Sequence, residues 1–82
     1  MSWRVRYTER ALRDLSKLDQ TVARRIVSST DRFARTESGD VKKLKGQSIL
    51  RLRVGDWRVF FQFSSTDEIE VVRVLHRADA YS

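Results

Sequence analysis

The feature that most constrains this fold is a pair of alternating segments joined by a two-residue turn. Apolar residues alternate with arginines over residues 50–54, and over residues 57–63 four apolar residues recur at every second position. Gly55-Asp56 lies between them, and glycine supplies the positive φ that a type II′ hairpin loop requires. Because successive side chains of a strand point to opposite faces, these segments predict a hairpin with one apolar face and one basic face.

The flanking segments predict an α+β fold. Alternation over residues 2–7 indicates a first strand, and apolar residues at helical spacing indicate two helices, capped by Thr8 and Asp19. Residues 69–75 are apolar on both faces, which is typical of a central strand. We therefore expect a single domain over residues 1–82, in the order β-α-α-β-β-β, with an antiparallel sheet and a helix hairpin packed on one side.

Several classes of protein and site are excluded by what the sequence lacks. The chain has no cysteine, which rules out disulfides and thiolate metal sites. We expect no metal site and no cofactor, since no His, Asp and Glu cluster has ligand spacing. The N-terminal residues lack the apolar run of a signal peptide and no segment is long enough to span a membrane, so we expect a cytoplasmic protein.

Positive charge is concentrated in the middle of the chain. The formal net charge is +6, and residues 42–58 contain six basic residues and one acidic residue. A local positive field of this kind is typical of a site that binds phosphate. A solvated basic face without a ligand is an equally good interpretation of the charge alone.

The predicted hairpin register gives the charge a more specific meaning. With Gly55-Asp56 as the loop, Arg53 lies opposite Arg58, and Arg51 shares their face. Like charges directly opposed across a sheet cost up to about 1 kcal/mol, a repulsion that a bound anion would relieve. The alternative is that the arginine stems lie along the sheet with their charged groups in water. We favour phosphate binding, with three nearby lysines as RNA-binding residues: Lys42, Lys43 and Lys45.

Three residues near the C-terminus carry ionisable groups: His76, Arg77 and Tyr81. A lone histidine at a strand end is more often an incidental polar group than a catalyst. An aromatic residue next to the terminus is normally a packing residue. Comparison with a family changes both interpretations.

Three motifs together resemble the RelE/ParE superfamily of toxins from toxin–antitoxin systems. They are Leu44-Lys45-Gly46, the segment from Leu50 to Val59 that contains the hairpin loop, and His76-Arg77-Ala78-Asp79-Ala80-Tyr81. The resemblance covers essentially the whole chain. The basic strand positions and the C-terminal arginine and tyrosine imply the RelE branch.

The resemblance implies a ribosome-dependent endoribonuclease that cleaves messenger RNA and is held inactive by a cognate antitoxin. Its partners would then be the antitoxin and the ribosome with bound mRNA. The catalytic residues implied by the family pattern are Arg51, Arg53, Arg58, Arg77 and Tyr81. Familiar members carry lysines at the positions of Arg51 and Arg53, so phosphate-binding roles transfer more directly than acid–base roles.

These residue types suit RNA cleavage by the 2′-hydroxyl group. Arginine forks can stabilise the charge of the phosphorane, but they are poor bases because their pKa exceeds about 12. Tyr81 is the better candidate for the base, since its reference pKa is about 10 and nearby arginines favour the phenolate. His76 is the second candidate for either proton transfer.

Two other functions remain open at this point. The same fold could bind and poison gyrase without any chemistry, as in the ParE branch. It could also be a basic RNA-binding domain that cleaves nothing. Loss of toxicity on replacing Arg58 or Tyr81 would distinguish the nuclease from the gyrase poison.

Overall fold

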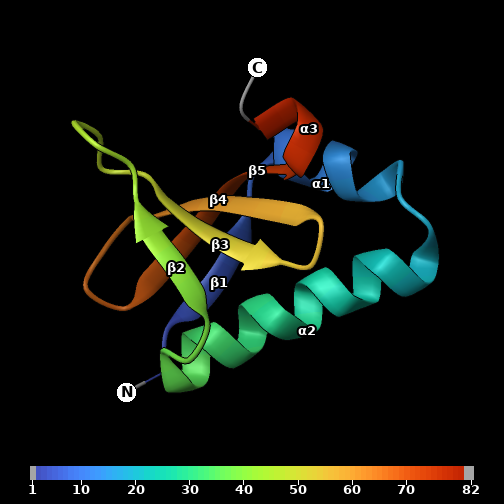
Figure 1. Ribbon diagram of the computed structural model, residues 1–82. Helices are drawn as coiled ribbons and strands as arrows, with labels where there is room; N and C mark the ends of the chain where they lie inside the picture. Colours follow the sequence, from blue (N-terminus) through green and yellow to red (C-terminus); the bar gives the residue numbers. More distant parts are fainter. Residues whose placement is uncertain (1, 81–82) are drawn as a thin grey trace.

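The computed structural model of the chain describes residues 2–80, which form a five-stranded sheet and three helices (Figure 1). The elements follow one another as β1 (Arg4–Tyr7), α1 (Glu9–Ser16), α2 (Gln20–Thr36), β2 (Asp40–Lys43), β3 (Leu50–Val54), β4 (Trp57–Phe63), β5 (Glu68–His76) and α3 (Arg77–Ala80). The predicted α+β class and the two long helices are confirmed.

The sheet has the strand order β1-β5-β4-β3-β2. The predicted antiparallel meander of β3, β4 and β5 is confirmed, with β5 in a central position. Two features differ from the expected sheet. β2 is an additional strand, paired antiparallel to β3, and β1 pairs parallel to β5, so the sheet is mixed rather than antiparallel. The connection between β1 and β5 contains both helices and the other three strands, which is long enough for a parallel pairing.

The helices begin at the residues that the sequence indicates. The side chain of Thr8 accepts a hydrogen bond from the Ala11 backbone N–H at 3.1 Å, and Asp19 accepts one from Thr21 at 3.1 Å. Each cap satisfies a backbone donor that the first helical turn leaves without an intrahelical acceptor. α1 and α2 therefore start where local capping is strongest.

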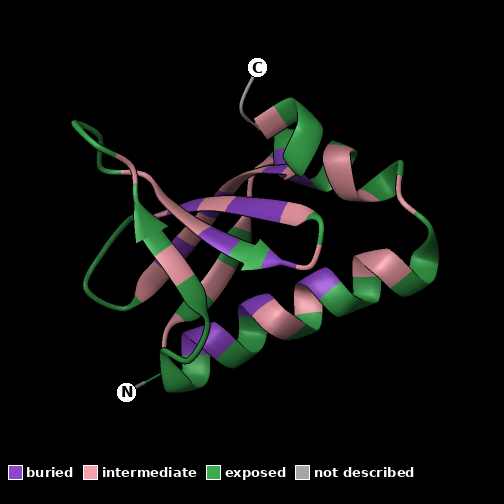
Figure 2. Cartoon of the chain, in the orientation of Figure 1, coloured by how far each residue is buried: buried purple, intermediate pink, exposed green. Residues whose placement is uncertain are grey.

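Both helices pack on the same face of the sheet. The buried residues of α2 recur at helical spacing, and Figure 2 shows them on the side of the helix that faces the strands. The buried apolar residues of the core are Ala11, Ile26, Phe33, Ala34, Leu52, Val54, Val59, Phe61, Ile69, Val71 and Val74. The opposite side of the sheet, called the open face below, carries the intervening side chains.

α1 also covers an edge of the sheet. Beyond the end of β1, the outer edge of β5 would have unpaired backbone groups. The Asp14 carboxylate accepts a hydrogen bond from the Val74 N–H at 2.9 Å and two from Arg73, at 2.8 and 3.3 Å. Thr8 completes the coverage, because its N–H donates to the Val71 carbonyl at 3.0 Å. This edge is thus closed by the N-terminal part of the chain.

In residues 2–80, no helix has both the length and the apolar character needed to cross a membrane.

Candidate phosphate-binding site

The open face contains a hollow of about 120 Å³ over β2, β3 and β4. Five side chains line this basic hollow: Asp40, Lys42, Arg51, Arg53 and Arg58. The predicted placement of the three arginines on one face is confirmed. The hollow therefore combines four cationic side chains with one carboxylate.

Like charges face one another twice across these strands. Arg53 lies opposite Arg58 in the predicted register, and Lys42 lies opposite Arg51. Asp40 is paired with Arg53 on its other side. Such opposition is unfavourable without a counter-ion, so this arrangement suits a ligand that brings negative charge.

Arg58 is buried, whereas Arg53 and Lys42 in the same hollow are exposed. Its relative exposure is 7%, and its Nη1 donates to the carbonyl oxygens of Gly55 and Trp57, each at 2.9 Å. Gly55 has a φ of 58°, as the first central position of a type II′ turn requires. The turn thus presents its own carbonyl groups to the guanidinium and fixes the orientation of its fork.

A second hollow lies on the other side of Arg58, next to α3. This C-terminal hollow, of about 340 Å³, is lined by Arg58, His76, Arg77 and Ala78. His76 pairs with Trp57 across β4 and β5, and the two rings meet edge to face at 5.2 Å. It therefore lies on the helix-covered side at the sheet end, outside the basic hollow. Arg58 borders both hollows.

Two hydrogen bonds to the backbone order the residues around the C-terminal hollow. The Nδ1 atom of His76 accepts from the Ala78 N–H at 3.2 Å, which leaves Nε2 as the protonated nitrogen of the neutral ring. The Arg77 N–H donates to the Asp56 carbonyl at 2.8 Å, and its Nε lies 3.6 Å from the Asp56 carboxylate. The hairpin loop is thereby tied to α3.

The structure does not bring all of the sequence-predicted residues together. Lys43 projects from the opposite face of β2, and Lys45 follows that strand in an exposed turn, so neither lines the basic hollow. Tyr81 lies outside the described residues. Asp40 was missed, because the segment that forms β2 has a single large apolar residue and gives no clear alternation.

The sequence of residues 5–81 matches the family model described as the ParE toxin of a type II toxin–antitoxin system, parDE. The chain belongs to this family of toxins. The match spans nearly all of the chain, which agrees with the resemblance of its motifs to the RelE/ParE superfamily. A search of curated proteins gave no match.

Solved structures of both RelE and ParE toxins resemble this toxin. The RelBE2 toxin–antitoxin complex of Mycobacterium tuberculosis has a TM-score of 0.78 at 25% identity, over 96% of this chain and 95% of that one. The archaeal RelE–RelB complex of Pyrococcus horikoshii has a TM-score of 0.76 at 27% identity, over 94% and 97%. The ParDE system of P. aeruginosa has a TM-score of 0.75 at 12% identity, over 90% of this chain and 95% of that one. At this identity the similarity shows the shared fold alone.

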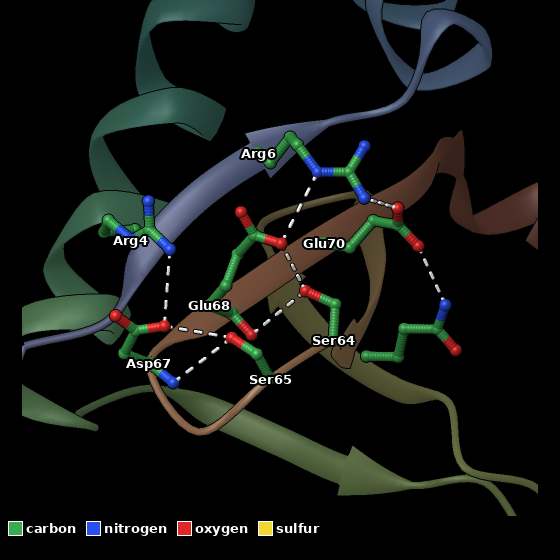
Figure 3. A network of polar contacts seen from close by, with 8 residues as sticks. Arg4, Arg6, Ser64, Ser65, Asp67, Glu68 and Glu70 are labelled. Atoms are coloured by element: carbon green, nitrogen blue, oxygen red, sulfur yellow. Dashed lines mark hydrogen bonds and ion pairs between the residues drawn. The ribbon is translucent and has the colours of Figure 1, made fainter.

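The remainder of the toxin's open face carries no excess of positive charge. Figure 3 shows a network over β1 and β5 in which Arg4 pairs with Asp67, and Arg6 pairs with Glu68 and Glu70. Hydrogen bonds from Ser64 and from Arg6 lower the pKa of Glu68, although partial desolvation opposes them. Three carboxylates thus face two arginines in this network, so the excess positive charge of the open face lies over β2, β3 and β4.

The arrangement can bind and polarise a phosphate group. Guanidinium forks bind two phosphate oxygens at fixed geometry, and a buried fork acts in a medium of lower dielectric than water. In residues 2–80, no group of three or more His, Asp or Glu side chains is placed to hold a metal ion. The cationic side chains of the basic hollow supply the positive charge that a phosphate group would meet.

Proposed function

We propose that this toxin is a cytoplasmic endoribonuclease that cleaves messenger RNA on the ribosome and so inhibits translation. The observation that carries the proposal is the position of Arg58, which is buried and fixed by the hairpin carbonyls between two hollows. A phosphodiester bound at Arg58 would have the cations of the basic hollow on one side, and His76 and Arg77 of the C-terminal hollow on the other.

The basic hollow is proposed to stabilise the charge that develops on the phosphorane. Arg58 would contact the scissile phosphate, with Arg51 and Arg53 beside it and Lys42 on the neighbouring phosphate. A donor that is already oriented needs no reorganisation when the charge develops, which is the basis of transition-state stabilisation by fixed groups. Lys43 and Lys45 would contact RNA outside the hollow.

Proton transfers are assigned to the C-terminal residues. Tyr81 is proposed as the base that activates the 2′-hydroxyl group, with Arg77 favouring its phenolate. His76 would protonate the 5′-oxygen leaving group from Nε2 as the imidazolium, a state in which Nδ1 is protonated and no longer accepts from the Ala78 N–H. His76 would take both transfers if Tyr81 takes neither.

A specific observation favours a second function. The family model that matches residues 5–81 is that of the ParE toxin. In the resemblance described above, the ParE branch poisons gyrase without any chemistry. In that case the basic hollow would bind a protein or DNA surface. The toxin would then block growth without producing new 5′ ends in messenger RNA.

Mapping messenger 5′ ends after brief induction distinguishes these functions. Arg58→Ala should lower cleavage by about 10²-fold to 10³-fold, as the loss of an oxyanion donor does. Arg35→Ala, an exposed change at the end of α2, is the matched control and should cleave normally. Thermal unfolding of both variants must show a folded protein, since Arg58 is buried.

Three results would contradict the nuclease. They are cleavage by Arg58→Ala at the wild-type rate, toxicity with no new 5′ ends, and RNA binding without cleavage. Inhibition of purified gyrase by the wild-type toxin would instead support the second function.

We also propose that a cognate antitoxin docks on the helix pair, as a mainly helical segment. An apolar groove of about 530 Å³ is lined by Leu15, Gln20, Ala23, Arg24, Val27, Ser28 and Asp31. Leu12 on α1 is 52% exposed, and an amphipathic helix is a common occupant of such grooves. The solved RelE relatives from M. tuberculosis and P. horikoshii are complexes with antitoxins.

Ala23→Arg tests the antitoxin groove. It should weaken antitoxin binding by at least about tenfold, because a buried charge without a partner is costly, while the toxicity of the free toxin persists. Arg35→Ala again serves as the control. Unchanged antitoxin affinity in Ala23→Arg would place the antitoxin elsewhere.

A further inference from the structure

An aromatic side chain lies among the cations of the open face. Phe60 on β4 has Arg51 directly opposite on β3 and Arg73 opposite on β5. It alternates with Val59 and Phe61, which are buried under the helices, so Phe60 projects to the open face. The ring is partly exposed, and it is neither a buried core residue nor one of the partly buried apolar residues packed against the core.

The surroundings of this ring are fixed. Arg73 is held by the Asp14 carboxylate through two hydrogen bonds, at 2.8 and 3.3 Å. Leu75, which pairs with Arg58, is a second partly exposed apolar residue on this face. Phe60 and Leu75 thus form a small apolar surface next to the buried guanidinium.

The distance from Arg58 to Phe60 matches the size of a nucleotide. The two residues are two positions apart on the same face of β4, which separates them by about 7 Å along the strand. A phosphate held at Arg58 therefore places the attached base within reach of the Phe60 ring. Aromatic side chains beside a basic groove are the usual means of holding single-stranded RNA.

We propose that Phe60 is a stacking platform for the base next to the phosphate held in the basic hollow. This inference deepens the proposed function, because it takes single-stranded RNA as the ligand of that site. Arg51 and Arg73 would flank the stacked base on either side, and Leu75 would support its edge. Phe60 is then a positioning residue that binds the base and takes no part in proton transfer.

Binding of two uncleavable ligands tests the platform. The first is a hexamer of 2′-O-methyl adenosine, and the second is the abasic 2′-O-methyl ribose phosphate hexamer of equal charge. The wild-type toxin should bind the adenosine hexamer about 10-fold to 100-fold more tightly, since stacking adds to phosphate binding. In Phe60→Leu this ratio should fall by about tenfold, and in Phe60→Tyr it should be kept.

Phe63→Leu is the matched control. Phe63 is on the same strand and 42% exposed, but it lies on the helix-covered side. Its ring packs on that of Trp3, with the ring centroids 4.6 Å apart. Its replacement should leave the ratio at the wild-type value. A similar fall in Phe63→Leu would show that the effect is not local to the open face.

Each other result has a definite meaning. An unchanged ratio in Phe60→Leu, or an equal loss of affinity for both hexamers, would overturn the platform and leave the phosphate site intact. Failure of the wild-type toxin to bind either hexamer would overturn both. Base-dependent binding without any cleavage of messenger RNA would overturn the nuclease and leave the platform standing.

Discussion

Tyr7 carries a hydroxyl group that is buried without a hydrogen-bond partner in residues 2–80. Thr30, its polar neighbour on α2, uses its own hydroxyl to donate to the Ile26 carbonyl at 2.8 Å. Burial raises the pKa of Tyr7 to about 12, although the Thr30 side chain opposes this shift, so the phenol is neutral at physiological pH. A neutral hydroxyl group that loses water and gains no partner destabilises the folded state.

Tyr7→Phe should therefore increase the free energy of unfolding. The expected gain is about 1 kcal/mol, because the change removes the unsatisfied hydroxyl group and keeps the ring. Urea unfolding of both proteins at pH 7 measures it. A loss of stability of comparable size would show that the hydroxyl group is hydrogen-bonded.

The depth of Arg58 is the residue-scale feature that the sequence did not predict. Alternation assigns a side chain to a face of the sheet, and this part of the prediction is confirmed for Arg51, Arg53 and Arg58. Burial depends on the turn carbonyls that receive the guanidinium. Every residue has a backbone carbonyl, so the pattern of side chains could not show that these two would bind the guanidinium and bury it.

Among the elements, the β3–β4 hairpin was predictable because its information is local. Glycine at the turn and the alternating side chains together define the register, which places Arg53 opposite Arg58. The parallel pairing of β1 with β5 was not predictable, since alternation looks the same in both directions. Its partners, such as Val5 and Ile69, are far apart in the sequence.

α1 and β5 are held together by one carboxylate. Burial raises the pKa of Asp14, but hydrogen bonds from Arg73 and from the Val74 N–H outweigh it, and the pKa of Asp14 lies below its usual value. A carboxyl group whose pKa is lowered by folding stabilises the protein above its unfolded pKa of about 3.9. That contribution is lost as the pH falls through the folded-state pKa.

Asp14→Asn should reduce the free energy of unfolding by about 1–3 kcal/mol at pH 7, because it removes charged hydrogen bonds. The difference from the wild-type protein should shrink below about pH 4, where the carboxylate is protonated in the unfolded chain and then in the folded one. Urea unfolding at pH 7, 5 and 3 measures both effects, with the exposed Asp31→Asn as control. A deficit that does not change with pH would point to packing instead of charge.

Across the whole molecule, the sequence predicted the amount of positive charge better than its position. Residues 42–58 were expected to bind phosphate as a unit, yet β2 turns Lys42 toward the hollow and Lys43 away from it. Over β1 and β5 three carboxylates face two arginines, so that half of the open face carries no excess positive charge. The excess positive charge of the open face therefore lies in the basic hollow.

Because this excess charge lies in one hollow, the salt dependence of RNA binding tests whether the RNA strand binds there. Four cations on the phosphates of a single strand give a slope of about −3 in a plot of log Kobs against log salt concentration, at about −0.7 for each contact. Arg53→Gln should make the slope shallower by about 0.7, whereas Arg35→Gln, at the exposed end of α2, should leave it unchanged. The measurement uses the uncleavable 2′-O-methyl hexamer at several salt concentrations. Equal changes in the two variants would mean that the charge of the whole surface, and not the hollow, binds the strand.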